Sequence, residues 1–313
     1  MMHLINNLKR KRVIRYLTLS KPDAFFKGLS HRVLSSFKSA ARNCPAYRKV
    51  LDSYGIMPES INKLDEFSQK VPVIDKNSFF AAYPFIDITG KKNFDNIRSV
   101  MTSSGFSGKF AYGVELKNST KYSRFFVDTA LDMFFKTSER KTFLINCTPM
   151  GVHVETSLPL AETSVRSDMV LALLSGVSPY YEQTIIIGDP YFLKKTVEEG
   201  CENGIDWKNL NVSLVMGQDW FPESLRSYLG SLMEIDPDSD TERLIIATMG
   251  LTELGLNVFH ESPETIKIRR CAQKNAKMHE KLFRTKIKAS GFLFHYYPMR
   301  FFIEEHQDLL IFS

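Results

Sequence analysis

The sequence predicts an α/β fold in which mostly parallel sheets are flanked by helices. Short apolar, β-branched runs recur along the chain, and helical segments separate most of them. Alternation of this kind favours a largely parallel sheet that is covered on both faces. The chain has 313 residues, 43% of them hydrophobic, and no long linker divides it. It is therefore long enough to bury a large core.

The elements expected in the middle of the chain follow from these runs. Strands are expected at residues 142–146, 184–187, 212–216 and 244–248. Asn118 or Ser119 can cap a helix with an aromatic stripe that we expect to face the core: Tyr122, Phe125, Phe126, Thr129 and Met133. Two more helices are expected, one opened by Asp189 and Pro190 and running to Glu199, and one over residues 223–233. Near the carboxyl terminus, alternation predicts additional β structure at 291–297, 301–304 and 308–312.

The most informative segment is a loop that follows an apolar approach, Ile97 to Met101. Gly105 and Gly108 permit positive φ, so successive amides can converge on an anion. Lys109 adds positive charge, and hydroxyl donors come from Thr102, Ser103, Ser104 and Ser107. A phenylalanine follows the lysine, where the common nucleotide hydrolases have a hydroxyl for magnesium. The composition predicts a phosphate site of another design, with a polar flexible turn as the alternative.

Two later turns also follow apolar strands. Residues 243–251 run into a turn that presents Thr252 and Glu253, for which a helix N-cap is the alternative interpretation. Between this turn and the loop, strand 212–216 leads into Gly217, Gln218 and Asp219 before the helix opened by Pro222. An ordinary strand-to-helix connection is the alternative there.

These segments together resemble the adenylate-forming (acyl-activating) enzymes, specifically the branch of phenylacetate–CoA ligase. Ser-Ser-Gly-Phe-Ser-Gly-Lys is similar to that family's Ser-Ser-Gly-Thr-Thr-Gly-Lys loop, and Met249 to Glu253 is similar to its Tyr-Gly-x-Thr-Glu motif. Residues 217–219 stand at the positions of its Gly-Gly-Glu turn. Gly217 is the same residue as in that motif, whereas Gln218 and Asp219 differ from it. Phe106 and Met249 are further departures. A lead-in with several prolines, from Asn43 to Pro84, is also similar, so the resemblance runs in order from about residue 30 to the end.

The resemblance implies ATP-dependent carboxylate activation, in which an acyl adenylate forms and then passes to CoA. It implies that the loop from Thr102 to Lys109 holds the β and γ phosphates of ATP. Thr252 would contact the α phosphate and Glu253 would carry Mg²⁺. The turn at 217–219, with Met249 and Gly250, would line the adenine site. His153 is a candidate wall of the acyl pocket, and a histidine satisfied by the backbone is the alternative.

The resemblance also sets expectations for the extent of the chain. Residues 1–313 correspond to the amino-terminal ATP- and carboxylate-binding domain, with 1–30 as a basic extension. The Arg-x-Gly-Asp segment and the lysine-bearing carboxyl-terminal lid domain of the family are absent from this chain, so we expect the lobe alone to be weakly active or inactive. Two alternatives stay open: an acyl-protein synthetase of the luminescence type, which transfers a fatty acyl group to a protein, and a degenerate binding or scaffold module.

Composition limits the remaining expectations. The formal net charge is +6, and the run Lys9–Arg12 could form a solvated helix, a membrane-surface contact or a nucleic-acid contact. We expect the solvated helix, no nucleic-acid partner, no stable membrane insertion and a cytoplasmic protein. The cysteines are scattered, and we expect no structural zinc at His260, Cys271 and His279. The expected partners are a small carboxylic acid and either CoA or an acyl-acceptor protein, with a homodimer as one expectation.

Overall fold

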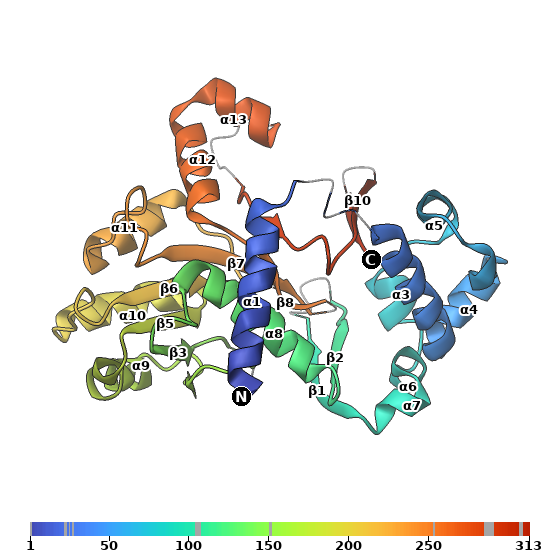
Figure 1. Ribbon diagram of the computed structural model, residues 1–313, viewed down its shortest axis with the longest axis horizontal. Helices are drawn as coiled ribbons and strands as arrows, with labels where there is room; N and C mark the ends of the chain where they lie inside the picture. Colours follow the sequence, from blue (N-terminus) through green and yellow to red (C-terminus); the bar gives the residue numbers. More distant parts are fainter. Residues whose placement is uncertain are drawn as a thin grey trace. The chain divides into compact units, whose positions relative to one another are not determined.

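The computed structural model describes residues 2–21, 24, 26, 28–103, 108–149, 152–252, 254–284, 291–306 and 309–313 (Figure 1). The chain forms two compact units. Unit 1 comprises residues 1–14, 123–250 and 256–296, and unit 2 comprises residues 15–122, 251–255 and 297–313. The first helix, α1 (Met2–Leu19), contributes to both units. Among the described residues, no helix combines the length and the apolar character that crossing a bilayer requires.

Unit 1 is built on a seven-stranded sheet with the order β4-β3-β5-β6-β7-β8-β9 within the described residues. The strands are β3 (Thr142–Asn146), β4 (Leu160–Glu162), β5 (Gln183–Gly188), β6 (Val212–Met216), β7 (Ile245–Leu251), β8 (Gly255–His260) and β9 (His295–Tyr296). From β4 to β7 every neighbouring pair is parallel, whereas β8 and β9 are antiparallel. The predicted α/β class with a mostly parallel sheet is therefore confirmed.

Helices cover both faces of this sheet because successive strand residues point to opposite sides. One core cluster holds Ile145, Ile186 and Leu214 and packs on α9 (Ser167–Gly176), α10 (Pro190–Glu202) and α11 (Glu223–Met233). The other holds Leu144 and Ile185 and packs on α8 (Thr120–Phe135) and α12 (Pro263–Lys274). A further helix, α13 (Ala276–Phe283), follows α12 directly. β3 and β6 are buried at every position, which explains their largely apolar sequences.

Unit 2 combines short helices with two small antiparallel sheets. Its elements are α3 (Leu29–Asn43), α4 (Pro45–Ser53), a 3-10 turn (Pro58–Ser60), α5 (Leu64–Lys70), a π-helical turn (Lys76–Phe80), α6 (Phe85–Thr89), α7 (Lys91–Phe94), β1 (Ile97–Thr102), β2 (Tyr112–Leu116), β10 (Ile303–His306) and β11 (Leu309–Phe312). β1 pairs with β2, and β10 pairs with β11. A small core around Phe37, Leu51 and Phe67 joins α3, α4 and α5.

Several predicted elements have the expected bounds and others do not. β3, β6 and α11 match their predicted ranges, and β7 begins one residue later than expected. The predicted strand at 291–297 is reduced to the two residues of β9. The stripe on α8 is partly wrong: Tyr122 is 61% exposed, and the face in the core carries Val127, Leu131 and Phe135 instead. Val127, Leu131 and Phe135 are spaced i, i+4, i+8 and so lie on one side of the helix. This side, rather than the predicted stripe, faces the core.

The basic run in α1 is not wholly solvated. Lys9, Lys11 and Arg12 are exposed as expected. Arg10 is buried, and its Nη1 lies 3.3 Å from an equally buried carboxylate oxygen of Asp128 on α8. Asp128 also accepts hydrogen bonds from the Thr156 hydroxyl and from Ser157. This ion pair fixes the first part of α1 to unit 1, which the sequence did not predict.

A buried histidine at the end of β8 makes the stability of the protein depend on pH. His260 is 4% exposed, and its ring lies against Phe134 and near His295. Burial, and secondly the charge of His295, lower the pKa of His260 to about 4. The unfolded chain protonates this residue near its ordinary pKa of about 6.5, so the stabilisation is present above that pH and is lost as the pH falls toward 4.

We expect the free energy of unfolding to fall by about 2 kcal/mol between about pH 7 and about pH 5 because of His260. Urea unfolding at the two pH values measures this loss, and His260→Gln should remove most of it. His31→Gln, which changes an exposed histidine, serves as the matched control. If the pH dependence of His260→Gln equals that of His31→Gln, the assignment is wrong.

Candidate functional site

The predicted phosphate loop joins β1 to β2 in unit 2. The two strands pair from Ile97↔Leu116 to Thr102↔Tyr112, and Ser103 closes the ladder. Its amide donates to the Ala111 carbonyl oxygen, and its Oγ accepts from the Ala111 amide, each at 3.0 Å. Ser103 is thus a closing residue of the hairpin, a role that its hydroxyl alone did not indicate.

The described part of this loop has the backbone that was expected of it. Gly108 has a φ of 76°, in the region that favours glycine, and Lys109 and Thr102 are exposed. The Lys109 ammonium group is therefore open to a ligand from solvent. Ser104, Gly105, Phe106 and Ser107 lie outside the described residues, and their predicted roles stay predictions.

A close backbone contact packs the Thr252 segment onto this hairpin. Gly113 on β2 is paired with Met101 on β1, and a Cβ at Gly113 would lie 1.9 Å from the Thr252 carbonyl oxygen. Only a residue without a side chain permits this approach. Thr252 is followed by a turn into β8 rather than by a helix, so the N-cap alternative is wrong. Glu253 itself lies outside the described residues.

Arg300 supports the turn that follows Thr252. Its Nη2 donates to the Leu254 carbonyl oxygen at 3.3 Å, and its guanidinium lies over the Phe301 ring. Burial lowers the pKa of the Arg300 guanidinium from its ordinary value. Gly255, with a φ of 93°, begins β8 at this point. Within unit 2, Thr252 is therefore held by the β2 backbone, and Leu254 is held by Arg300.

In unit 1, the predicted adenine-lining turn follows β6 at the carboxyl edge of the sheet. The Gly217 amide donates to the Gly188 carbonyl oxygen at 3.0 Å, and a Cβ at Gly217 would lie 3.3 Å from Thr248 Cγ2. Gln218 has a φ of 78°, so it keeps a left-handed backbone without being glycine. Met249 is 40% exposed, and Gly250 is also exposed. The ends of β6 and β7 lie side by side, as the parallel sheet predicted.

Two carboxyl groups meet at this edge. Asp189 follows β5 and caps α10 by accepting from the amides of Tyr191 and Phe192. Partial burial, and then a hydrogen bond and the charge of Asp189, raise the pKa of Asp219. The neighbouring carboxylate therefore disfavours the charged form of Asp219. The sequence placed Asp219 in the turn but gave no indication of Asp189 as its neighbour.

A buried cluster of four charged residues lies beneath the turn and was not predicted. Glu223 and Arg226 come from α11, Glu261 follows β8, and Arg269 lies on α12; each is at most 4% exposed. Arg226 bonds to both acids, with Nη2 2.6 Å from Glu261 Oε2, and Arg269 Nη1 is 2.7 Å from Glu223 Oε1.

The same cluster binds the backbone around the turn. Glu261 Oε2 accepts from the Ala247 amide at 2.8 Å, and Arg226 donates to the Ile245 carbonyl oxygen. Arg269 Nη2 donates to the Phe221 carbonyl oxygen at 3.0 Å. The strand that leads to Met249 and the segment that follows Asp219 are therefore fixed to one set of compensating charges.

His153 lies at the other end of the same edge, over β3 and β4. Its Nδ1 is 2.6 Å from Glu162 Oε1, and its Nε2 is 3.3 Å from Glu155 Oε1. Glu155 is buried and is also paired with Arg124. The alternative of a histidine satisfied by the backbone is wrong, because two carboxylates orient this ring. Its role as an acyl-pocket wall stays a prediction.

The three residues weighed as zinc ligands have different surroundings. His260 is buried against Phe134, Cys271 is exposed on α12, and His279 is buried against Phe283. Within the described residues, no group of three or more His, Cys, Asp or Glu side chains is arranged to hold a metal ion.

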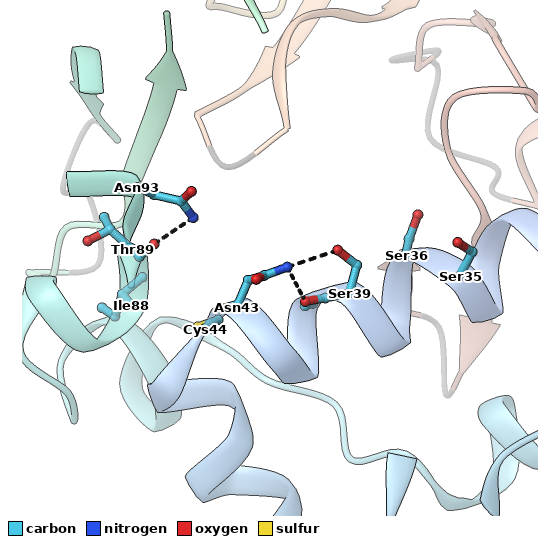
Figure 2. A pocket seen from close by; sticks show the side chains of 9 residues that line it. Ser35, Ser36, Ser39, Asn43, Cys44, Ile88, Thr89 and Asn93 are labelled. Carbon is cyan, nitrogen blue, oxygen red and sulfur yellow. Dashed lines mark hydrogen bonds between the residues drawn. The ribbon is translucent and has the colours of Figure 1, made fainter. Parts of the chain in front are cut away.

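A polar hollow in unit 2 was not foreseen. It has a volume of about 540 Å³ and lies between α3 and the segment of α6 and α7. Figure 2 shows its lining of short neutral side chains, among them Ser39, Asn43 and Thr89. Asn43 Nδ2 donates to the Ser39 carbonyl oxygen and hydroxyl, and Asn93 Nδ2 donates to the Thr89 carbonyl oxygen. None of its lining residues in the described part of the chain is charged, so it does not match the phosphate site that the sequence predicted.

Comparison with known proteins identifies the fold. No family model and no curated protein matches the sequence. The structure is similar to 2-hydroxyisobutyryl-CoA ligase in an open conformation with 2-HIB-AMP and CoA (TM-score 0.60, 12% identity, 76% of this chain and 53% of that chain). It is also similar to that ligase in the thioesterification state with the same ligands (0.60, 12%, 78% and 52%) and in the postadenylation state with 2-HIB-AMP (0.57, 14%, 77% and 51%).

The chain therefore has the fold of an adenylate-forming enzyme, as its motifs predicted, and it spans about half the length of the similar structures. At 12–14% identity this likeness concerns the fold alone. The branch of phenylacetate–CoA ligase, the site residues and the ligands stay predictions.

Proposed function

We propose that this chain is the nucleotide- and acyl-binding lobe of an ATP-dependent carboxylate-activating enzyme. The reaction is the formation of an acyl adenylate from ATP and a small carboxylic acid, followed by transfer of the acyl group to the thiol of CoA. The fold supports this proposal, since the similar structures hold an acyl adenylate and CoA.

One observation carries the proposal. The contact between Gly113 and Thr252 joins, within unit 2, two motifs that are far apart in the sequence. Met101 and Thr102, which lead into the glycine- and hydroxyl-rich loop, pair with Gly113 and Tyr112. A phosphate held by that loop would therefore have the Thr252 segment beside the end of the hairpin that carries the loop. This arrangement fits two motifs that act on one triphosphate.

The residues of unit 2 are suited to bind and neutralise phosphate oxygens. In the proposed reaction a carboxylate oxygen attacks the α phosphorus and pyrophosphate leaves, so negative charge on the phosphates must be stabilised. Lys109, exposed beside the left-handed Gly108, would contribute a cation, and the Thr252 hydroxyl a polar contact. Glu253 is the proposed carrier of Mg²⁺, which supplies further positive charge when bound. The roles of residues 217–219, Met249 and Gly250 at adenine follow from the resemblance.

We expect Lys109→Gln to weaken ATP binding about tenfold, because hydrogen bonds to charged groups are stronger than neutral ones. Isothermal titration with ATP and Mg²⁺ measures the change. Lys91→Gln is the matched control, since Lys91 is an exposed lysine of the same unit. If the two variants have the same affinity as the wild type, Lys109 does not contact phosphate.

The function as a whole is tested by two further measurements on the same protein. Glu253→Gln should weaken ATP binding in the presence of Mg²⁺ and have little effect without it. Exchange of pyrophosphate into ATP in the presence of carboxylic acids then reports adenylate formation, with a slow rate expected for the lobe alone. A folded protein that binds no nucleotide would instead favour the scaffold interpretation, and acyl transfer to a protein rather than to CoA would favour the acyl-protein synthetase.

A further inference from the structure

The pair of helices α12 and α13 carries most of the net charge of the protein. Residues 263–284 contain seven Lys or Arg residues and two Glu residues, a difference of +5, and the whole chain has a formal net charge of +6. Asn275 ends α12 and caps α13, so one residue separates the two helices. In Figure 1, α13 extends beyond α12 and away from the strands of unit 1. This places the charge on a projecting corner of that unit.

Five of the seven cations face solvent and two do not. Arg269 belongs to the buried cluster, and Arg270 is paired with Asp238. We call the other five the basic corner: Lys267, Lys274, Lys277, Lys281 and Arg284, all exposed. In the part of the chain that the structure describes, none of the five lies within ion-pair distance of a carboxylate. Lys267 still interacts electrostatically with Asp236 and Glu264, so the charge available to an outside partner comes chiefly from the other four.

Helix electrostatics accounts for Lys274 and Lys281, which lie in the last turns of α12 and α13, but not for Lys277. Lys277 lies in the first turn of α13, where the helix dipole disfavours a cation. Lys277 and Lys281 are spaced i, i+4 on the exposed side, so their like charges repel each other. Lys277 thus carries a charge that costs local stability and has no ion-pair partner among the described residues, which indicates an anionic partner outside the chain.

The kind of side chain favours one class of partner. Four of the five residues are lysines, which are depleted in protein–protein interfaces, and the Trp and Tyr residues that anchor such interfaces are absent from 263–284. The exposed apolar residues there are aliphatic: Ile268 is 40% and Leu282 is 41% exposed. Four to eight cations on a helical surface with aliphatic neighbours are suited to a membrane of anionic lipids, which needs no fixed positions for its charges.

We propose that the basic corner is a docking surface for an anionic phospholipid bilayer. The bound state is peripheral, with the five cations at the headgroups and Leu282 near the interface. The proposal is independent of the proposed function, because none of its residues belongs to the candidate site.

The test is cosedimentation of the full chain with phosphatidylcholine vesicles that contain about one-third phosphatidylserine. The wild type is expected to bind these vesicles, to be released by salt, and not to bind pure phosphatidylcholine. The triple variant Lys274→Gln, Lys277→Gln, Lys281→Gln should bind about 100-fold more weakly, because each cation near the surface contributes about a factor of five.

The matched control removes the same charge elsewhere: Lys70→Gln, Lys91→Gln, Lys92→Gln, all exposed lysines of unit 2. It should retain the wild-type affinity within about threefold. Equal losses in both triple variants, or no binding of the wild type at low salt, would overturn the proposal. Binding to a duplex oligonucleotide without binding to the vesicles would overturn it in favour of a nucleic acid. Circular dichroism of all variants checks that the fold is intact.

Discussion

Gly113→Ala is expected to lower the free energy of unfolding by about 3 kcal/mol, at the upper end of what overpacking usually costs. The added Cβ would lie 1.9 Å from the carbonyl oxygen of Thr252 and 3.2 Å from its Cγ2. Backbone atoms cannot turn away as the end of a long side chain can, so the segment 251–255 or the β1–β2 hairpin must shift. Without this contact the same change would stabilise a strand, because alanine has less conformational freedom to lose than glycine. Urea unfolding therefore tests both the sign and the size of the change in the free energy of unfolding.

Gly176→Ala is the matched control, because it adds the same atom where no other atom lies within 4 Å. It lies in α9, where alanine is favoured over glycine by up to about 1 kcal/mol. The two variants should thus change stability in opposite directions. If the proposed function is correct, Gly113→Ala also weakens ATP binding, since it displaces Thr252. A stable Gly113→Ala protein would show that the hairpin and the Thr252 segment are not packed together.

Arg226→Met is expected to lower the free energy of unfolding by about 4 kcal/mol. Arg226 has no exposed surface and bonds to Glu223, Glu261 and the Ile245 carbonyl oxygen. Methionine fills much of the same volume, but it leaves two buried carboxylates with Arg269 as the remaining buried cation between them. A buried charge that loses its partner is costly because it cannot recover its hydration. The measurement is the urea midpoint together with the slope of the transition.

An exposed ion pair provides the comparison. Arg166 bonds to Asp168 through two nitrogens, yet both side chains are more than 60% exposed. Arg166→Met should therefore leave the free energy of unfolding nearly unchanged. Equal losses in the two variants would mean that burial does not govern the contribution of these arginines. The buried cluster also fixes the strand that leads to Met249 and the segment that follows Asp219. Arg226→Met should therefore alter the candidate site as well as the stability.

The central sheet was predictable from the sequence because its strands are buried on both faces. Residues 142–146 and 212–216 are largely apolar runs of strand length. α10 begins at Pro190, and Pro222 stands directly before α11, both at helix starts where proline is favoured. Local chemistry alone sets these boundaries. The strands near the carboxyl terminus were less predictable, since an alternating pattern of half-buried residues also fits a turn, and most of 291–297 is not in a strand.

The candidate site was predictable where a motif is local. The left-handed Gly108 and the turn after β6 follow from glycine positions, and the parallel sheet brings the ends of β6 and β7 together. The contact of Gly113 with Thr252 was not predictable, because a glycine in a strand shows that something approaches closely but not what approaches. Ser104, Gly105, Phe106, Ser107 and Glu253 lie outside the described residues, so their roles depend on the resemblance.

Charged residues were the hardest to interpret from the sequence. In the sequence, Glu223, Arg226 and Arg269 look like solvent-facing charges of two surface helices, and Glu261 looks like a charge in the turn before the second. Only the fold shows that they neutralise each other in the interior. The basic corner presents the opposite difficulty. Its cations can be read in the sequence, but the buried Arg269 and the paired Arg270 lie between Lys267 and Lys274 along α12. Only the three-dimensional structure therefore shows which cations are exposed and unpaired among the described residues.

The division of unit 2 among three stretches of the chain has a consequence for protein synthesis. The β1–β2 hairpin leaves the ribosome well before residues 251–255 and 297–313, which complete the unit. A two-stranded hairpin by itself is only marginally stable in water. The nascent hairpin therefore stays partly unfolded, with unpaired strand edges, until the later segments of unit 2 have been synthesised. Translation speed and chaperone access during that interval should therefore influence the yield of native protein more than the stability of the finished fold suggests.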